Sequence, residues 1–147
     1  MPCRCQLLFQ ARRVSVDYQL IDFDVKGDAT GSLVAIEGAG NIPFKIKRVY
    51  YIYGTTSAAV RGRHAHRRLQ QLIFCPIGSC EFTLDDGRER QTIRLQHPNQ
   101  GLYIKNSIWR EFNNFSPDCV VMVLASECYD ESDYIRNYDE FLREVRG

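Results

Sequence analysis

The chain has 147 residues, of which 44% are hydrophobic and 25% charged, and its net charge is +1 at pH 7. This length suffices for one domain with a real core, and the balanced charge excludes bulk nucleic-acid binding through a strongly basic surface. No apolar run approaches the ~20 residues of a membrane-spanning helix, and the start, MPCRCQLLFQARR, is a poor secretory signal. We therefore expect a single cytoplasmic domain over residues 1–147, with residues 1–17 an extension of unassigned structure and with neither nucleic acid nor membrane as a partner.

Short β-rich runs separated by turn residues dominate the chain. Asp85-Asp86-Gly87 is the clearest turn and predicts a hairpin, because Asp-Gly accepts positive φ angles. Further turns are expected at Pro76-Ile77-Gly78 and over residues 97–101. The strands predicted by their β-branched and aromatic content cover residues 44–53, 72–75, 80–84, 92–95, 101–104 and 119–125.

In the C-terminal segment the spacing of apolar residues changes from that of a strand to that of a helix. Over residues 130–145 the apolar positions recur at helical spacing, acidic residues gather at the start, and Arg143 and Arg146 lie near the end, as the helix dipole favours. The sequence therefore predicts an all-β fold, a small antiparallel barrel or jelly roll, followed by one amphipathic helix.

The six cysteines give no disulfide pattern. Without a secretory signal, Cys75, Cys119 and Cys128, which lie in or beside apolar runs, are expected to be small buried thiols, and Cys3-x-Cys5 lacks the second pair of a zinc site. The cysteines are Cys3, Cys5, Cys75, Cys80, Cys119 and Cys128.

The stretch RGRHAHRRLQQ holds two of the three histidines, His64 and His66, which point to the same face if the segment is a strand. With Gln71 and Gly78 they read H-x-H-x4-Q-x6-G, which resembles the first motif of the cupins, where two histidines and a glutamate bind a metal. Here the neutral Gln71 replaces the carboxylate, and Arg110 falls where the second motif should supply another histidine. We predict a cupin scaffold without a metal.

Two neighbouring imidazoles without a metal suggest general acid–base chemistry, since histidine titrates near neutral pH. The alternative is that the His-Ala-His segment is a surface turn in a basic loop. Gln71 and Gly78, in register with the motif, favour the catalytic interpretation.

Four motifs carry a resemblance to a known family. They are RVYY at 48–51, RGRHAH at 61–66, LDDG at 84–87 and YDESDYIR at 129–136. In this order they resemble the nucleotide-sugar 3,4-ketoisomerases, small cupin enzymes related to the C-terminal part of the WxcM-like proteins. The resemblance covers about residues 18–143. It implies conversion of dTDP-4-keto-6-deoxyglucose into the dTDP-3-keto-6-deoxyhexose through an enediolate, for deoxysugar and polysaccharide biosynthesis, without cofactor, in a homodimer that exchanges strands.

The resemblance also implies roles for individual residues. It places the proton transfer on the histidine pair, with His64 as the main shuttle and His66 assisting, although their order stays open. Tyr50 is expected to hydrogen-bond the imidazole or a sugar oxygen, and packing in the core is an equally good interpretation.

The remaining expected substrate contacts concern the nucleotide. Arg48, Arg61 and Lys105 could pair with the diphosphate, and Gln71 could line the pocket. Tyr103 or Trp109 could stack on the base, with core packing as the alternative for Trp109. Arg63, Arg67 and Arg68 are expected on a solvated rim.

The chain departs from the family pattern in two places, and other functions are also compatible with its sequence. Relatives often carry Arg-Gly-x-Leu where this chain has TGSL at 30–33, and many have histidine in place of Arg110. The alternatives are a non-catalytic sugar-nucleotide-binding cupin, a metal-dependent cupin oxygenase, and an RmlC-like 3,5-epimerase. The last would want a histidine paired with an aspartate, and the sequence shows no obvious partner of that kind.

Overall fold

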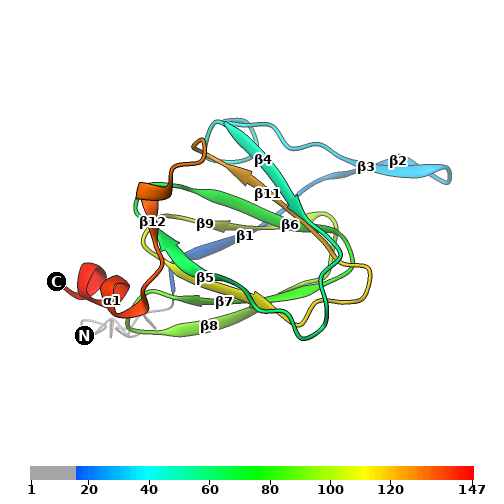
Figure 1. Cartoon of the computed structure of the whole chain (residues 1–147). Coiled ribbons are helices and arrows are strands. Elements are labelled where there is room, and N and C mark those ends of the chain that lie inside the picture. Colours follow the sequence, from blue (N-terminus) through cyan, green and yellow to red (C-terminus); the bar gives the residue numbers. More distant parts are fainter. Residues whose placement is uncertain (1–15) are drawn as a thin grey trace, which may run out of the picture.

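The computed structural model of the chain describes residues 16–147, and in it two antiparallel five-stranded sheets face each other (Figure 1). One has the order β1-β9-β6-β11-β4, the other β12-β5-β10-β7-β8, and β2 and β3 form a separate hairpin. The strands are β1 (Tyr18–Asp22), β2 (Val25–Asp28), β3 (Gly31–Val34), β4 (Arg48–Ile52), β5 (Arg61–His66), β6 (Gln71–Ile77), β7 (Cys80–Asp85), β8 (Arg90–Leu95), β9 (Gln100–Ile104), β10 (Trp109–Asn113), β11 (Val120–Ala125) and β12 (Tyr134–Ile135).

The core lies between the two sheets. Along β8, for example, Ile93 and Leu95 are buried whereas Thr92 and Arg94 are exposed, as the two-residue period of a strand requires. Leu84, Leu102 and Val121 from three other strands are fully buried in the same cluster. The predicted antiparallel barrel or jelly roll is confirmed.

The predicted hairpin at Asp85-Asp86-Gly87 joins β7 to β8 as expected. Gly87 has φ +89°, and its backbone N–H donates to the Asp85 carboxylate over 2.7 Å. The predicted turn at Pro76, by contrast, is wrong by two residues, since β6 runs through Ile77 and the chain reverses at Gly78, φ +75°. A register shift between β6 and β11 accommodates the proline, which cannot donate to the sheet.

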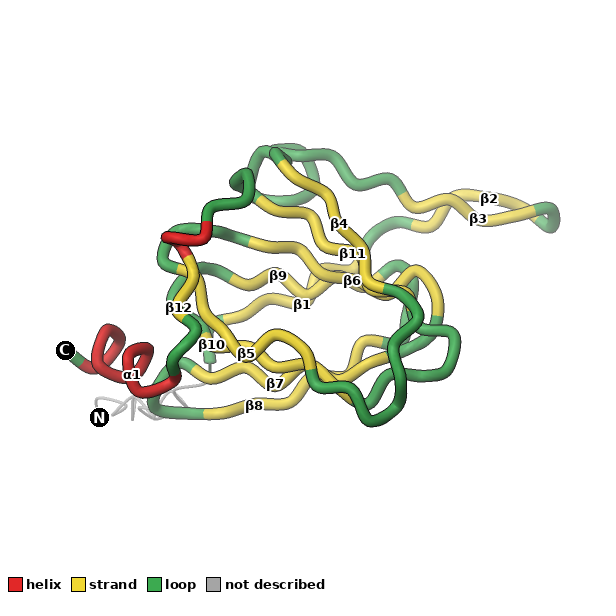
Figure 2. The backbone as a smooth tube through the Cα atoms, in the orientation of Figure 1, coloured by secondary structure: helices red, strands yellow, loops and turns green. Residues whose placement is uncertain are grey.

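The helix expected over residues 130–145 is correct only in its second half. The chain forms a 3-10 turn, η1 (Glu131–Asp133), then β12, and only then the helix α1 (Tyr138–Arg146). Two side-chain caps break the segment, because Asp130 accepts from the Ser132 N–H and Asn137 accepts from the Glu140 N–H. Helix α1 lies outside the barrel at the end where β12 is found, and the β2–β3 hairpin projects beyond the opposite end (Figure 2).

Replacing Asn137 with Ala should lower the free energy of unfolding by about 1 kcal/mol, because the first turn of α1 loses its cap at 2.9 Å. Urea denaturation followed by far-UV circular dichroism measures the change. Arg88→Ala, in the exposed β7–β8 turn, is the matched control. An unchanged midpoint for Asn137→Ala would contradict the capping role.

Within residues 16–147, none of the helical segments has the length and apolar character needed to cross a bilayer. Cys3, Cys5 and most of the N-terminal extension lie outside the described residues. The predicted buried thiols are confirmed for Cys75 and Cys119, and Cys80 is buried as well, whereas Cys128 is exposed.

Candidate functional site

The two imidazoles meet inside the barrel, on β5. Their ring centroids are 4.8 Å apart and the rings are nearly perpendicular, at 87°. His66 is fully buried and His64 half-buried, so the prediction that both project to one interior face is confirmed. Ala65, between them, points the other way and packs beneath α1 with Phe141.

A bulge in β5 aims His64. Arg110 of β10 pairs with His64 but the next residue, Glu111, pairs with Gly62, which leaves an extra residue on β5. Gly62 has φ +82°, and a Cβ placed on it would lie 2.8 Å from the Arg110 carbonyl oxygen. Only glycine fits this position, which explains the glycine of the RGRHAH motif.

Tyr134 is the site residue that the sequence analysis missed. Its ring centroid lies 5.0 Å from that of His64 and 4.4 Å from that of His66. The Arg136 guanidinium covers the same ring at 4.2 Å and is held by Glu131 through two hydrogen bonds of 2.6 and 2.9 Å. The YDESDYIR motif contained this signal, but the helical interpretation of the segment placed Tyr134 on a helix instead of beside β5.

A buried hydrogen-bond network ties Arg110 to Tyr50. Arg110 is 1% exposed, and its Nε and Nη2 donate to the Ile108 carbonyl over 3.2 and 2.8 Å. Its Nη1 donates to the Gln71 Oε1, and Gln71 Nε2 donates to the Tyr50 hydroxyl over 3.0 Å. Arg110 therefore keeps a positive charge inside the barrel beside the imidazoles.

This environment keeps both imidazoles neutral. Burial, followed by the charge of Arg110, lowers the pKa of His64 to about 4 and that of His66 to about 2. Burial also raises the pKa of Tyr50, so its phenol keeps its proton at neutral pH, and lowers the pKa of Arg110 to about 10. The site therefore combines neutral bases with a neutral phenol and a buried cation.

His66 also has a carboxylate neighbour, contrary to the expectation that no aspartate pairs with a histidine. The Asp133 Oδ2 lies 3.3 Å from His66 Nδ1, although the two are not aligned as a hydrogen bond. Asp133 is fixed by the backbone N–H groups of Arg68 and Leu69, at 2.8 and 3.2 Å. This contact could not be predicted from local sequence patterns, because 67 positions separate the two residues along the chain (133 − 66).

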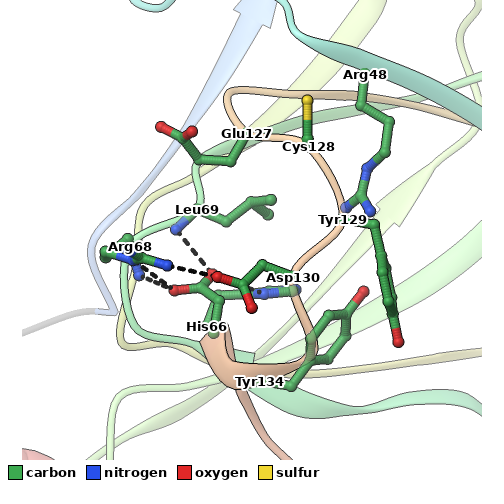
Figure 3. Close-up of a pocket in the computed structure, with 10 residues that line it drawn as sticks. Arg48, His66, Arg68, Leu69, Glu127, Cys128, Tyr129, Asp130 and Tyr134 are labelled. Atoms are coloured by element: carbon green, nitrogen blue, oxygen red, sulfur yellow. Dashed lines mark hydrogen bonds and ion pairs between the residues drawn. The ribbon is translucent and has the colours of Figure 1, made fainter.

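A cavity of about 320 Å³ opens beside His66, between Arg48, Tyr129, Tyr134 and the Asp130–Asp133 turn (Figure 3). Arg48 and Tyr50 lie on one face of β4, and the Arg48 guanidinium stands 5.3 Å from the Tyr50 ring and 5.6 Å from the Tyr129 ring. Its Nε and Nη2 are buried and have no hydrogen-bond partner among the described residues. Arg48 can therefore serve an anionic ligand.

The other expected substrate contacts do not line this cavity. Arg61 is exposed at the start of β5, and exposed Lys105 pairs with Asp17 over 3.2 Å. The Tyr103 hydroxyl donates to Gln70 over 2.6 Å, and its ring stacks on Phe44 in an apolar cluster.

Trp109 is a core residue, which favours core packing over stacking on a base as the interpretation of this side chain. It is 4% exposed and packs against Tyr138 and Phe141 beneath α1. The expected basic rim also needs correction, because Arg67 holds α1 through Glu140 and Glu144, at 2.9 and 2.6 Å.

The donor set does not suit a divalent metal. His64 and His66 offer two nitrogens, but Gln71 offers a neutral oxygen that is already bonded to Arg110. The Arg110 guanidinium occupies the place of a third ligand and would repel a cation there. These residues therefore do not fit a divalent metal ion.

Both the sequence and the fold of this chain match those of known proteins. The family model described as FdtA, WxcM-like, C-terminal, matches residues 16–146. A TDP-4-oxo-6-deoxy-alpha-D-glucose-3,4-oxoisomerase from Aneurinibacillus thermoaerophilus is 51% identical over 130 residues, which cover 88% of this chain and 94% of that protein. The 3,4-ketoisomerase structure from Helicobacter canadensis has a TM-score of 0.88 and 50% identity, covering 90% of this chain and 100% of its own.

Two further solved structures, one of a ketoisomerase and one of an epimerase, resemble this chain. A variant of the 3,4-ketoisomerase QdtA from Thermoanaerobacterium thermosaccharolyticum, in complex with TDP-4-keto-6-deoxyglucose, is 45% identical with a TM-score of 0.86, covering 88% of this chain and 94% of its own. The RmlC epimerase of Mycobacterium tuberculosis, 16% identical with a TM-score of 0.68 over 80% of this chain and 66% of its own, shares the fold alone. The chain belongs to the WxcM-like, C-terminal family of sugar 3,4-ketoisomerases, and its predicted class, an isomerase, is confirmed.

Proposed function

We propose that the protein converts TDP-4-keto-6-deoxyglucose into the TDP-3-keto-6-deoxyhexose by acid–base chemistry on its own side chains. The observation that carries the proposal is the pair of facing imidazoles, one buried and one half-buried and both neutral at neutral pH, beside the buried cation of Arg110. The substrate named for the relatives is the second support.

His64 is the better placed of the two imidazoles for proton transfer. It is half-buried, whereas His66 is fully buried with Asp133 behind it. The 4-ketone acidifies the hydrogen on C3, His64 accepts that proton, and the electron pair moves to the oxygen on C4 to give an enediolate. The proton of the C3 hydroxyl passes to the oxygen on C4, the protonated imidazole delivers its proton to C4, and the oxygen on C3 becomes the ketone. The product is therefore an isomer of the substrate, with no atom gained or lost.

Tyr50 and Arg110 stabilise the charge that develops. A protonated phenol donates a hydrogen bond to an oxyanion, and a cation in a water-poor barrel interacts with it more strongly than in bulk water. Gln71 holds both groups through its amide. His66, fixed near Asp133, packs edge-on against His64 and keeps it oriented.

Arg48 is the proposed anchor for the nucleotide diphosphate. Its buried, unpartnered nitrogens face the cavity, and a guanidinium can bind phosphate oxygens through two parallel hydrogen bonds. Exposed Tyr129, at the rim, offers a ring to the thymine base.

Incubation with TDP-4-keto-6-deoxyglucose in D2O, followed by NMR, tests the function. We expect the 3-keto product with deuterium at C4, partial where the imidazole retains the original proton. The same spectrum reports the configuration at C4. Return of unchanged 4-keto sugar would contradict the assignment.

A 3,5-epimerase is the second candidate, because His66 and Asp133 approach within 3.3 Å. Such an enzyme would exchange the hydrogens on C3 and C5 and leave the ketone at C4. Deuterium at C5 would therefore support the epimerase, and a ketone at C3 without exchange at C5 supports the isomerase.

We also propose that the protein is a homodimer in which the β2–β3 hairpin reaches the second copy. All of β2 is exposed, Val25 and Leu33 are 52% and 58% exposed, and the hairpin stands away from the barrel (Figure 1). Apolar side chains on a projecting arm suit burial against another subunit.

Light scattering after size-exclusion chromatography should give twice the mass of the chain, and Leu33→Glu should shift the protein toward monomer. Val60→Glu, at an exposed apolar residue 41% accessible outside the hairpin, is the control. A wild-type monomer at micromolar concentration would rule out the dimer.

A further inference from the structure

We propose that Cys75, Cys80 and Cys119 form a binding site for a trivalent thiophilic metalloid, arsenic(III), which cross-links the two sheets. The three Sγ atoms lie within 4.8 Å of one another, and those of Cys75 and Cys80 are 3.5 Å apart. The three residues are 1%, 0% and 2% exposed. None of these three cysteines lines the cavity beside His66.

The spacing of the sulfurs suits a shared central atom. Trivalent arsenic carries a lone pair and binds three sulfurs in a pyramid, so bonds of about 2.3 Å place the sulfurs about 3.4 to 3.5 Å apart. One observed separation, 3.5 Å, matches that value, and the other two, at most 4.8 Å, are close enough to shorten to it. Small rotations of three side chains would complete the site without moving the backbone.

The surroundings select the charge of the ligand. The thiols lie in a cluster of apolar side chains that includes Phe82, Phe112 and Phe115. Three thiolates around a divalent ion would bury a net negative charge there, and a monovalent ion would bury two, which is costly without a counterion.

Trivalent arsenic avoids that cost because every species is neutral. Arsenous acid, As(OH)3, exchanges its three hydroxyl groups for three thiols, and the products are As(S-Cys)3 and three water molecules. Three S–H and three As–O bonds break, three As–S and three O–H bonds form, and no electron is transferred. The reaction needs no oxidant or reductant.

The fold gives the complex a structural consequence. Cys75 lies on β6 and Cys119 directly precedes β11, both in one sheet, whereas Cys80 begins β7 in the other. A three-way bond would therefore join the two sheets covalently. Because the sulfurs are buried, entry requires local opening of the Gly78–Cys80 and Ser116–Cys119 turns, and binding should be slow.

The test uses the full chain with Cys3, Cys5 and Cys128 replaced by Ser, so that only the three buried thiols remain. Sodium arsenite is added under a phosphine reductant, which does not compete as a dithiol would. We expect one arsenic per chain in native mass spectrometry, three sulfur ligands in arsenic X-ray absorption, and a higher midpoint of thermal unfolding.

Single replacements in this background complete the test. Cys75→Ala, Cys80→Ala and Cys119→Ala should each weaken arsenite binding at least tenfold while circular dichroism stays native. Arsenic bound only when urea unfolds the chain, or affinity unchanged in the Cys80→Ala variant, would overturn the proposal. Retention of stoichiometric Zn²⁺ in place of arsenic would overturn the choice of a trivalent ligand.

Discussion

Replacing His64 with Asn should lower kcat about 10²- to 10⁴-fold, the usual contribution of a general acid–base group. The amide keeps much of the shape of the imidazole but cannot accept a proton from C3. Because His64 is half-buried and its Nδ1 has no hydrogen-bond partner within residues 16–147, the fold should tolerate the change. Turnover of TDP-4-keto-6-deoxyglucose, followed by NMR, measures the effect.

Two variants frame the interpretation of that result. His97→Asn, in an exposed turn, should retain wild-type turnover and controls for the substitution itself. His66→Asn separates the two roles, since a positioning residue should leave more residual activity than the base. Wild-type kcat in the His64→Asn variant would remove this residue from the mechanism.

Replacing Arg110 with Met has the second largest expected effect, because one side chain holds the whole buried network. The change leaves the Ile108 carbonyl and the Gln71 amide oxygen without their donor, at about 1–3 kcal/mol for each unsatisfied group. It also removes the cation from the enediolate site. We expect lower stability in urea and a kcat reduced about 10²- to 10³-fold, as for the loss of one oxyanion donor.

The same variant should change the pH dependence in a defined direction. Arg110 contributes to the low pKa of His64, about 4, so its removal should raise that pKa, although burial, the larger cause, keeps it below the ordinary value of 6.5. The acid limb of kcat/KM against pH should therefore move to higher pH. Arg88→Met, on an exposed turn, should leave the limb in place, and an unmoved limb in Arg110→Met would refute the electrostatic role.

The low pKa values of the two histidines also make the stability of the wild-type protein depend on pH, with lower stability at lower pH. His64 and His66 have lower pKa values folded than unfolded, so the unfolded chain binds more protons below pH 6.5. Their contribution to stability is fully present above that pH and is lost as the pH falls through about 4 for His64 and about 2 for His66.

The sequence predicted the parts of this protein that local patterns determine. His64 and His66 could be assigned to one strand face from their spacing alone, and the Asp85–Gly87 hairpin from its turn chemistry. Strands β1 and β10 were missed because YQLID and WREFN mix polar and apolar residues without a clear alternation. They form because neighbouring strands pair with them on one or both sides.

The site was predicted less completely, since its missing members depend on contacts between distant segments. Tyr134 and Asp133 reach the imidazoles only because β12 pairs with β5, and the helical period of residues 134–145 concealed that pairing. The two interpretations of Trp109 stayed open for a related reason, because no residue near it along the chain indicates that α1 covers it.

The pairing of β12 with β5 also sets when the enzyme can begin to work. Tyr134 follows all the other strands along the chain, yet its ring closes one side of the imidazole pair and its strand completes the sheet edge beside His66. A nascent chain that has formed every other strand would still lack a finished active centre. Catalytic activity therefore depends on the segment that follows β11, and truncation just before Asp130 should leave a largely intact barrel with an incomplete active site.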